Sequence, residues 1–366
     1  MSVPRVQIVI LNWNGYKDTI GCLASVFALE YRDFGVVVCD NGSTDGSLER
    51  IREWAAQGDL VSTSGDDHEL PKRAITGGPI HFVEYDRETA ETGGLGDTHE
   101  RLALIRNGKN LGFAGGTNVG LRYLLARANA EYVWLLNNDT VVAPSALREL
   151  VDRAEADSLC GAVGGTLFEQ REPDRVQEMG GATVSSWHGM VKVLGRGLPA
   201  SDPRPRELEL DYVSGGCVLV RSEVLTRVGL LDERFFIYGE DVDWGLRMRQ
   251  AGLRLLYAPA AHIWHQGSAS SMRASPTHDY HNIRGSLLLI HKHHPSRLPV
   301  AMAYSIYRCF LPKAVRREWS RLAAVARAYR DVLRQIRQTT RPVEVKSAGS
   351  LRAPEQHQSL PSGIAS

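Results

Sequence analysis

Short, uninterrupted apolar runs alternate with segments of helical spacing over the first 140 residues of this 366-residue chain. The runs at 6–13, 35–39, 102–106 and 132–136 have the pattern of strands buried on both faces. Such strands belong to parallel sheets, whose right-handed crossovers place helices on both faces. The sequence therefore predicts an α/β fold with a Rossmann-like, mostly parallel sheet.

Helix signals fall between and after these runs. Apolar spacing indicates helices over 19–29 and 114–128, and cap chemistry at 43–45 begins another that runs to residue 54. Pro144 opens a helix, and a further one is expected over 239–250, ending at Gly252. Strands are also predicted at 160–168 and 190–194.

The chain divides into three parts by composition. Residues 1–290 are expected to form one domain, in which 58–100, rich in Gly, Asp, Glu and Thr, read as a surface insertion with one short strand at 81–85. Residues 291–341 are expected to form a basic, amphipathic helical region. Residues 342–366 are rich in Ser, Pro and Gln and are expected to be disordered.

Charge is spread unevenly along the chain. Residues 292–341 carry 12 basic and 2 acidic side chains, whereas residues 1–291 sum to about −9. This distribution does not predict a nucleic-acid-binding protein. From Val315 to Ile336 apolar side chains recur in a helical stripe flanked by arginines. Two interpretations stay open: a helix packed on the body with a solvated basic face, or an interfacial helix on an anionic membrane.

Targeting and redox signals are few. The sequence shows no signal peptide and no apolar run of about 20 residues that could span a bilayer. Its five cysteines form no C-x-x-C pair, which predicts no disulfide framework and favours a reducing compartment. We therefore expect a cytoplasmic protein, attached to the inner face of the plasma membrane if the interfacial interpretation holds.

Polar side chains follow three of the predicted parallel strands, at 12–14, 40–43 and 137–139. Ligands of open α/β sheets bind outside the carboxyl ends of the strands, so three such ends indicate a shared pocket. The alternative is that they serve only as turns and helix caps. Asp40 at a strand end suits hydrogen bonds from a base or ribose. No G-x-G-x-x-G follows the first strand and no G-x-x-x-x-G-K-[ST] occurs, which removes support for dehydrogenases and P-loop proteins.

The third strand end, Asn137-Asn138-Asp139, suits a hard divalent cation that carries a diphosphate. Mg²⁺ and Mn²⁺ favour carboxylate, carbonyl, water and phosphate oxygens, and usually take only one or two protein carboxylates. Asp139 would be the main ligand, with Asn137 a weak or water-mediated one.

Six ordered motifs carry a family resemblance. The chain resembles a family-2 glycosyltransferase of the GT-A fold, in the bacterial rhamnosyltransferase-like branch, over about residues 6–267 apart from 58–100. The motifs are Val-Ile-Leu-Asn-Trp-Asn-Gly (9–15), Asp-Asn-Gly-Ser-Thr-Asp-Gly-Ser (40–47), Asn-Leu-Gly-Phe-Ala-Gly-Gly-Thr-Asn (110–118), Leu-Leu-Asn-Asn-Asp-Thr (135–140), Gly-Gly-Cys-Val-Leu-Val-Arg (215–221) and Phe-Phe-Ile-Tyr-Gly-Glu-Asp-Val-Asp-Trp (235–244).

The resemblance implies a nucleotide-sugar donor (a dTDP- or UDP-sugar, with dTDP-rhamnose the family-based choice), Mg²⁺ or Mn²⁺, and inversion at the anomeric carbon. The acceptor would be a glycan or a polyprenyl-diphosphate-linked glycan of cell-surface polysaccharide synthesis. The implied donor-binding residues are Asn12, Asn14, Asp40, Asn110 and Asn138. Asp139 would hold the metal, where the first position of the family's acidic tip is here the amide Asn137, and His265 is a better candidate than His262 for an additional ligand.

An inverting transfer needs a base on the face opposite the leaving diphosphate. The resemblance points to Asp241 as this base, with Glu240 orienting the acceptor. The alternative is that both acids only complement the dipole of the helix they begin. Trp244 is a sugar platform or part of the core. Competing functions are a polyprenyl-phosphate sugar synthase, a non-catalytic nucleotide-sugar-binding subunit and, less favoured, a nucleotidyltransferase.

Overall fold

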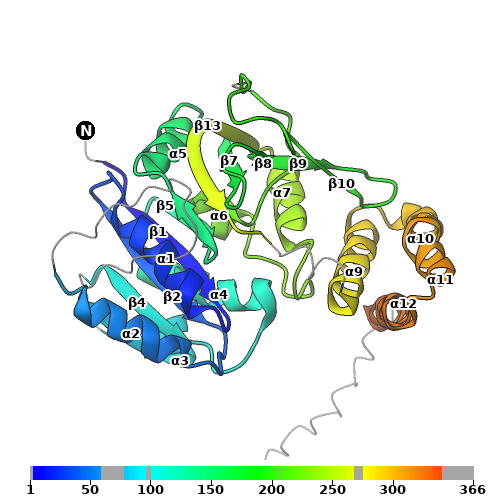
Figure 1. Cartoon of the computed structure of the whole chain (residues 1–366), viewed down its shortest axis with the longest axis horizontal. Helices are drawn as coiled ribbons and strands as arrows, with labels where there is room; N and C mark the ends of the chain where they lie inside the picture. Colours follow the sequence, from blue (N-terminus) through cyan, green and yellow to red (C-terminus); the bar gives the residue numbers. More distant parts are fainter. Residues whose placement is uncertain (1–2, 59–77, 96–99, 206, 268–274, 340–366) are drawn as a thin grey trace, which may run out of the picture.

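The computed structural model describes residues 3–58, 78–95, 100–205, 207–267 and 275–339. Its centre is one large sheet in the order β3-β4-β2-β1-β5-β12-β7-β13-β6 (Figure 1). The first five strands of this order pair in parallel, which confirms the predicted sheet. They are β3 (Phe82–Asp86), β4 (Leu102–Arg106), β2 (Phe34–Asp40), β1 (Val6–Asn12) and β5 (Tyr132–Asn137).

Helices cover both faces of the sheet, as the burial pattern of the strands required. Along β1, Ile8 and Ile10 pack into the core on one face and Val9 into the core on the other. The first core also contains α1 (Tyr16–Phe27), α2 (Ser47–Gln57) and α5 (Ala146–Glu155). The second contains α3 (Arg87–Glu91), α4 (Gly112–Arg127), α6 (Ser222–Arg227) and α7 (Glu240–Gln250).

The other half of the sheet is mixed and was only partly predicted. β12 (Cys217–Arg221) runs antiparallel between β5 and β7 (Cys160–Glu169), and β13 (Arg254–His265) pairs with β7 in parallel and with β6 (Thr140–Val142) antiparallel. β8 (Val176–Met179) pairs with β7, and β10 (Val191–Val193), β9 (Gly181–Val184) and β11 (Tyr212–Val213) form a second, small sheet. Sequence reasoning predicted β7 and β10 but no strand at 217–221 or 254–265.

The segment expected as a surface insertion contributes to the main sheet where it is described. The short strand expected at 81–85 is β3, which pairs with β4 along its full length. α3 follows it directly, and Asp86 caps that helix by accepting a hydrogen bond from the backbone N–H of Thr89 at 2.8 Å. Residues 59–77 and 96–99 of the segment lie outside the described residues, as does the tail at 342–366.

The C-terminal region is helical, as expected, and forms a layer beside the body (Figure 1). Its first helix begins at Pro276, before the expected boundary at residue 290. A third core of buried apolar side chains joins this layer to Phe235 and Val242 of the body. The layer consists of α9 (Pro276–His293), η1 (Pro295–Arg297), α10 (Leu298–Ser305), η2 (Ile306–Phe310), α11 (Leu311–Val315) and α12 (Trp319–Thr339).

The apolar stripe expected between Val315 and Ile336 is not the buried face of α12. That helix packs on α9 through Ala324, Val325, Ala328 and Val332. The expected stripe lies at the margin of this contact: Tyr329 and Ile336 are half-buried against it, whereas Trp319 and Leu333 are exposed. Across the described residues, every helix is too short or too polar to traverse a lipid bilayer.

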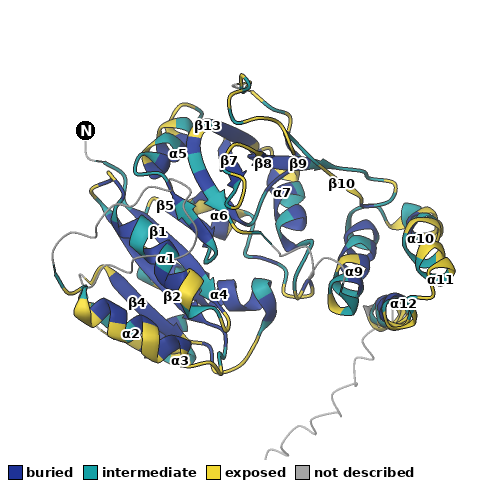
Figure 2. Ribbon diagram, in the orientation of Figure 1, coloured by how far each residue is buried: buried dark blue, intermediate teal, exposed yellow. Residues whose placement is uncertain are grey.

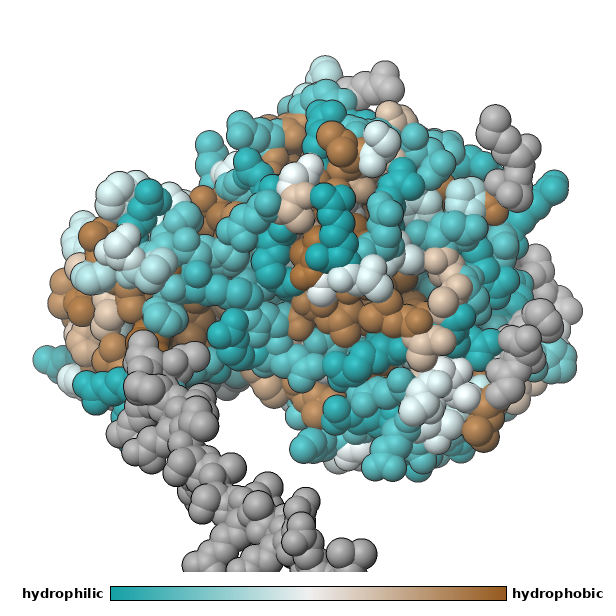
Figure 3. Space-filling view, turned by 180° about the vertical axis from the view of Figure 1, so that it is seen from behind, coloured by the Kyte–Doolittle hydropathy of each residue, from teal (hydrophilic) through white to brown (hydrophobic). Residues whose placement is uncertain are grey.

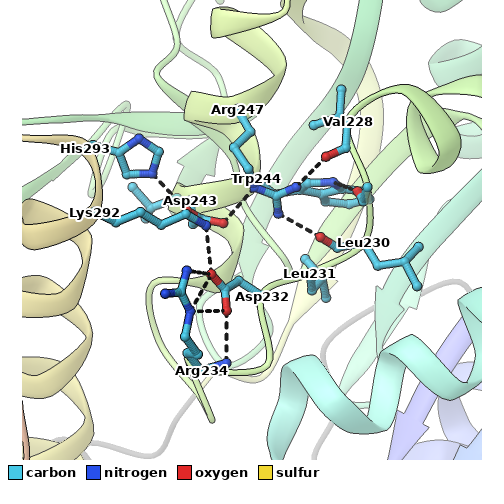
Figure 4. A network of polar contacts seen from close by, with 12 residues as sticks. Val228, Leu230, Leu231, Asp232, Arg234, Asp243, Trp244, Arg247, Lys292 and His293 are labelled. Carbon is cyan, nitrogen blue, oxygen red and sulfur yellow. Dashed lines mark hydrogen bonds and ion pairs between the residues drawn. The ribbon is translucent and has the colours of Figure 1, made fainter. Parts of the chain in front are cut away.

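A buried network of ion pairs attaches α9 to α7 (Figure 4). Asp243 of α7 is fully buried and accepts hydrogen bonds from Arg247 Nε at 2.8 Å and His293 Nε2 at 2.8 Å. Lys292 Nζ lies 2.7 Å from Asp243 Oδ1 and 2.7 Å from Asp232 Oδ2, so it joins the loop before α7 to the same cluster. Breaking such a pair from one side leaves uncompensated buried charge.

The loop before α7 is also held by backbone contacts. Arg247 donates to the carbonyl oxygens of Val228 at 2.8 Å and Leu230 at 2.7 Å. Gly285 of α9 must be a glycine, since a Cβ there would lie 2.2 Å from the carbonyl oxygen of Tyr238. The chain that leads into α7 is therefore fixed by both α7 and α9.

We expect Asp243→Ala to destabilise the protein by about 3 kcal/mol or more, because Lys292 and Arg247 lose a buried anion. The measurement is the free energy of unfolding in urea. Glu53→Ala is the matched control, because it removes an exposed 3.1 Å pair with Arg50 and is expected to cost less than about 0.5 kcal/mol. Equal stabilities of the two variants would contradict the structural role of the network.

Candidate active site

The ends of β1 and β2 are joined by side-chain hydrogen bonds. Asn12 and Asp40 are partners in the strand register, and both are buried. Asn12 Nδ2 donates to Asp40 Oδ1 at 2.8 Å and to Ser43 Oγ at 3.1 Å, while its Oδ1 accepts from Thr19 Oγ1 at 2.8 Å. Both N–H groups of Asn12 are thus used within the protein. Asp40 Oδ2 accepts from the backbone N–H of Ser43 at 3.1 Å, so this carboxylate orders the turn that follows β2.

Asn14 links the same two strand ends from the solvent side. Its backbone N–H donates to Ser43 Oγ at 2.9 Å, and its Oδ1 accepts from the backbone N–H of Thr44 at 2.7 Å. Asn14 has a φ of 50°, in the left-handed region that asparagine tolerates better than most residues. It is exposed, so it lies at the surface of the site.

Asn110 is held next to β2 by Asn41, which the sequence placed in the polar strand end at 40–43 without a role of its own. Asn41 is buried, and its Nδ2 donates to Asn110 Oδ1 at 3.1 Å and to the carbonyl oxygen of Gly112 at 3.1 Å. Its Oδ1 accepts from the backbone N–H of Leu111 at 3.1 Å. Asn41 is the second residue of the motif at 40–47, in which only the carboxylate of Asp40 was assigned a contact with the donor.

The third strand end meets His265 of β13. His265 Nε2 lies 3.1 Å from Asp139 Oδ1 and 3.3 Å from Asn137 Nδ2. Its Nδ1 lies 2.6 Å from Gln177 Oε1. The Gln177 amide donates through Nε2 to Glu169 at 3.0 Å, so Oε1 is left to accept from an Nδ1–H group on the ring. This contact leaves Nε2 as the nitrogen that faces Asp139.

These residues fit a divalent cation. Adjacent ligands about 2.1 Å from an octahedral Mg²⁺ lie about 3 Å apart, and the Asp139 Oδ1 to His265 Nε2 separation is 3.1 Å. Burial raises the pKa of Asp139, but the hydrogen bond and charge of His265 with its ring protonated outweigh this and hold the pKa below its ordinary value, so Asp139 is a carboxylate. A bound cation would take the place of the proton on Nε2. Among the described residues, Asp139 and His265 are two donors of the kind such a cation takes, and they are not part of any cluster of three or more His, Cys, Asp or Glu.

Asn138 points back into the strand ends. Its Nδ2 donates to Thr19 Oγ1 at 3.0 Å, and Thr19 in turn donates to Asn12. The tip at 137–139 is therefore connected to the tip of β1 through one hydroxyl group. A Cβ on Gly15 would lie 3.0 Å from Asn138 Nδ2, which shows how closely the two tips approach.

A glycine turn joins Asp241 to this edge of the sheet. The backbone N–H of Gly215 donates to Asp241 Oδ2 at 3.2 Å, and the carbonyl oxygen of Gly216 accepts from the backbone N–H of Asn137 at 3.1 Å. A Cβ on Gly215 would contact Asp241 at 3.6 Å, and one on Gly216 would contact Asn137 Nδ2 at 3.6 Å and His265 Cε1 at 3.8 Å. The two glycines thus leave space between the base candidate and the cation-binding residues.

The buried carboxyl groups near this turn have perturbed acidities. Burial raises the pKa of Asp241, while backbone hydrogen bonds from Gly215 and Val242 oppose that rise. Burial, and secondarily the Asp241 charge, raise the pKa of Glu240 well above its ordinary value, and among the described residues its Oε2 has no hydrogen-bond partner. Burial and the Asp241 charge also raise the pKa of Glu178 to about 7. Sequence reasoning missed Glu178, because a lone acid in a short strand carries no motif.

Aromatic side chains lie on the loop before these acids. Phe236 is exposed and stacks on His281 of α9, with ring centroids 5.2 Å apart. Its carbonyl oxygen accepts from the backbone N–H of Phe113 at 2.7 Å, at the start of α4. Trp244, in contrast, is buried and donates to the carbonyl oxygen of Gly229 at 2.8 Å, so it belongs to the core. His262 stacks edge-on against Phe168 and is a packing residue.

Two family models match the chain. The model described as "Glycosyltransferase like family 2" matches residues 85–278, and that described as "Glycosyl transferase family 2" matches residues 7–68. Together they cover the three strand tips, the glycine turn and the Glu240–Asp241 pair.

Curated relatives are named for sugar transfer, and a solved structure shares the fold. An N-acetylglucosaminyl-diphospho-decaprenol L-rhamnosyltransferase of Mycobacterium tuberculosis is 26% identical over 274 residues, or 70% of this chain and 74% of the relative. The dTDP-rhamnosyl transferase RfbF of Shigella flexneri is 24% identical over 203 residues, or 53% and 65%. The mannosyltransferase PcManGT of Pyrobaculum calidifontis, solved with GDP-Man and Mn²⁺, is 17% identical with a TM-score of 0.50, over 91% of this chain and 88% of that one.

We expect the free energy of unfolding of the unmodified protein to fall as the pH rises from 5 to 8, and that of the Glu178→Gln variant to fall less. Between pH 4.5 and about 7 the folded state keeps a proton on Glu178 that the unfolded chain loses, so rising pH costs stability. The total loss of folding free energy over this pH range is about 3 kcal/mol, and it does not occur with glutamine, which does not ionise. Thermal unfolding without added divalent ions measures the difference. Glu49→Gln on the exposed side of α2 is the control, and parallel pH profiles for all three proteins would contradict the prediction.

Proposed function

Because the chain belongs to glycosyltransferase family 2, we propose that it is an inverting, metal-dependent enzyme of cell-surface polysaccharide synthesis. It moves a sugar from a nucleoside-diphosphate donor to a hydroxyl group of a glycan or polyprenyl-diphosphate-linked acceptor. The observation that carries this proposal is the glycine turn at 215–216. It bonds to Asp241 on one side and to the end of β5 on the other, so the base and the diphosphate site adjoin.

The proposed donor is a deoxysugar nucleotide such as dTDP-rhamnose. The support is the similarity to transferases that are named for rhamnose and dTDP-rhamnose. The nucleoside lies against the tips of β1 and β2, where Asn14 is exposed and Asp40 keeps acceptor capacity beyond its two internal bonds. Asn12 stabilises these strand ends through its hydrogen bond to Asp40, and Asn110 flanks the diphosphate or the sugar.

Asp139 and His265 would hold a Mg²⁺ or Mn²⁺ ion, with Asn137 contributing directly or through water. The ion, when bound, offsets negative charge on the leaving diphosphate. The protein's own part is to keep Asp139 ionised and to fix the ring of His265. Gln177 does the latter, as outer partners of metal-binding histidines generally do.

Asp241 is the proposed base. It accepts the proton of the acceptor hydroxyl as that oxygen forms its bond to the anomeric carbon. The bond between the anomeric carbon and the diphosphate oxygen breaks on the opposite face, and its electron pair leaves with the nucleoside diphosphate. Burial raises the pKa of Asp241 and so makes it a stronger base than an exposed aspartate. Glu240, with its unpartnered Oε2, would accept a hydrogen bond from a second acceptor hydroxyl.

The proposal is tested first with a panel of nucleotide sugars. Incubation of the protein with Mn²⁺, each donor and a lipid-linked acceptor should release free nucleoside diphosphate with one donor. Turnover on a bare polyprenyl phosphate in place of a glycan acceptor would favour a polyprenyl-phosphate sugar synthase. Nucleotide binding without any turnover would favour a non-catalytic binding subunit.

We expect Asp241→Asn to lower the transfer rate by about 100-fold or more, because an amide cannot accept the hydroxyl proton. Affinity for the nucleoside diphosphate should change little, because Asp241 lies across the glycine turn from the cation-binding residues. Product release measures the first and calorimetry the second. Asp152→Asn, on the exposed side of α5, should keep full activity, and an Asp241→Asn variant as active as this control would remove the assignment.

We expect Asp139→Asn to abolish the dependence of nucleoside-diphosphate binding on Mn²⁺. Gln177→Leu should weaken Mn²⁺ binding by about 10-fold or more without removing a ligand, because the ring of His265 loses its fixed orientation. Titration of Mn²⁺ at constant nucleotide measures both effects. Binding by the unmodified protein that is indifferent to Mn²⁺ would contradict the metal assignment.

A further inference from the structure

A continuous helical stretch of the C-terminal layer exposes large apolar side chains. α10, η2 and α11 follow one another without a break from Leu298 to Val315 (Figure 1). Along them and at the start of α12, Tyr307 is 67% exposed, Val315 83% and Trp319 66%. Figure 2 shows yellow, exposed positions along α10 and α11, and Figure 3 shows apolar side chains gathered at the left edge, where these helices lie in that view.

The exposed apolar side chains share one face. They recur every three or four residues, and residues at that spacing are neighbours on a helix surface. The set along the continuous stretch is Val300, Ala303, Tyr307, Leu311 and Val315. Trp319 is also exposed and begins α12 after a turn at 316–318, in which Arg317 has a φ of 55°. These six residues are called the apolar face below.

The opposite side of this stretch is anchored to the layer. Ala301 and Ser305 are buried, and the hydroxyl of Tyr329 donates to the carbonyl oxygen of Met302 at 3.1 Å. The exposure of the apolar face is therefore a property of a packed element.

The charges around the apolar face are positive. Between residues 298 and 320 the sequence has four basic residues and a single acid, Glu318, which pairs with Arg321 at 2.7 Å. Arg308, Arg316 and Arg317 are exposed and form no ion pair with any residue that the structure describes. The face thus combines exposed apolar side chains, one tryptophan and one tyrosine with uncompensated guanidinium groups.

We propose that the apolar face lies on a bilayer that contains anionic lipids, with Arg308, Arg316 and Arg317 at the level of the lipid phosphates. Amphipathic helices bind interfaces in this way, apolar side inward and basic residues toward anionic headgroups. Tyrosine and tryptophan concentrate at the boundary between headgroups and acyl chains. A bilayer contact also needs no spanning segment.

Charge distinguishes a bilayer from a second copy of the chain. A two-fold contact through this face would bring the same patch of each copy together. The three unpaired arginines would then face arginines, which opposes association. An anionic bilayer instead supplies the missing counter-charges.

The docking does not depend on the proposed transfer reaction, but ionic contacts connect the docking layer to the helix that carries the proposed base. α9 carries the stretch, and Lys292 and His293 of α9 bind Asp243 in α7, three residues after Glu240. The orientation of the layer on a membrane would therefore also set the orientation of α7.

The test is flotation of the full chain with two kinds of vesicle, pure phosphatidylcholine and an equal mixture of phosphatidylcholine and phosphatidylglycerol. We expect binding to the mixture, at least tenfold weaker binding to pure phosphatidylcholine, and loss of binding as salt is raised. Equal binding to both vesicles, or binding to neither, would overturn the proposal.

Two triple variants locate the surface. Leu311→Ser/Val315→Ser/Trp319→Ser and Arg308→Gln/Arg316→Gln/Arg317→Gln should each reduce binding to the mixed vesicles at least tenfold. The matched controls alter exposed residues elsewhere, Leu95→Ser/Leu159→Ser and Arg32→Gln/Arg171→Gln, and should bind as the unmodified chain does. Thermal unfolding shows that each variant is folded.

Three results reject the inference: triple variants that bind as well as the controls, controls that lose binding equally, or a dimer in sedimentation that the apolar variant abolishes. Turnover with a water-soluble acceptor analogue separates this proposal from the proposed function. It should be the same in the triple variants and the unmodified chain, so a failure of transfer and a failure of docking are recorded by different measurements.

Discussion

The hydrogen bond from the backbone N–H of Asn137 to the carbonyl oxygen of Gly216 connects the parallel half of the main sheet to its mixed half. On one side are the parallel strands, whose register alone places Asn12 beside Asp40 and Leu11 beside Asn137. On the other is β12, an antiparallel strand inserted next to β5, which carries the glycine turn and with it Asp241. Without β12 in that position, Asp241 would not be joined to the strand tips.

Carboxyl groups on the two sides of that turn have pKa values that are shifted in opposite directions. On the side of the proposed cation site, the His265 hydrogen bond and charge outweigh burial and keep the pKa of Asp139 low. On the side of the proposed base, burial dominates and raises the pKa of Asp241, Glu240 and Glu178. Neighbouring acids whose environments separate their pKa values in this way are typical of sites that divide charge stabilisation from proton transfer. A purely structural pair of helix-start acids would be expected at the solvent-exposed end of a helix, where Glu240 is not.

The parts of this arrangement that the sequence could predict are those set by local pattern. Strands buried on both faces require a parallel sheet, and a parallel sheet aligns their carboxyl ends, so the grouping of Asn12, Asp40 and Asp139 followed from apolar runs. Gln177 and Glu178 could not be found this way, because the register of β8 on β7 brings them to the site and a four-residue strand has no periodic signal. The prediction that the arginine-flanked stripe is the apolar face of α12 was wrong for a related reason. Periodicity locates an apolar face but not its partner, and the contact with α9 uses small residues beside that stripe.

The buried charges between α7 and α9 fix the orientation in which the C-terminal layer is attached to the body. An apolar contact would hold two helices together, but it tolerates sliding and repacking. Asp243, bonded at once to Arg247, Lys292 and His293, is satisfied in one register only. We infer that the ionic network is retained for orientation rather than for stability, which buried ion pairs supply poorly. The proposed base, Asp241, lies two residues from Asp243 on the same helix, so under the proposed membrane docking this network would fix its angle to the bilayer.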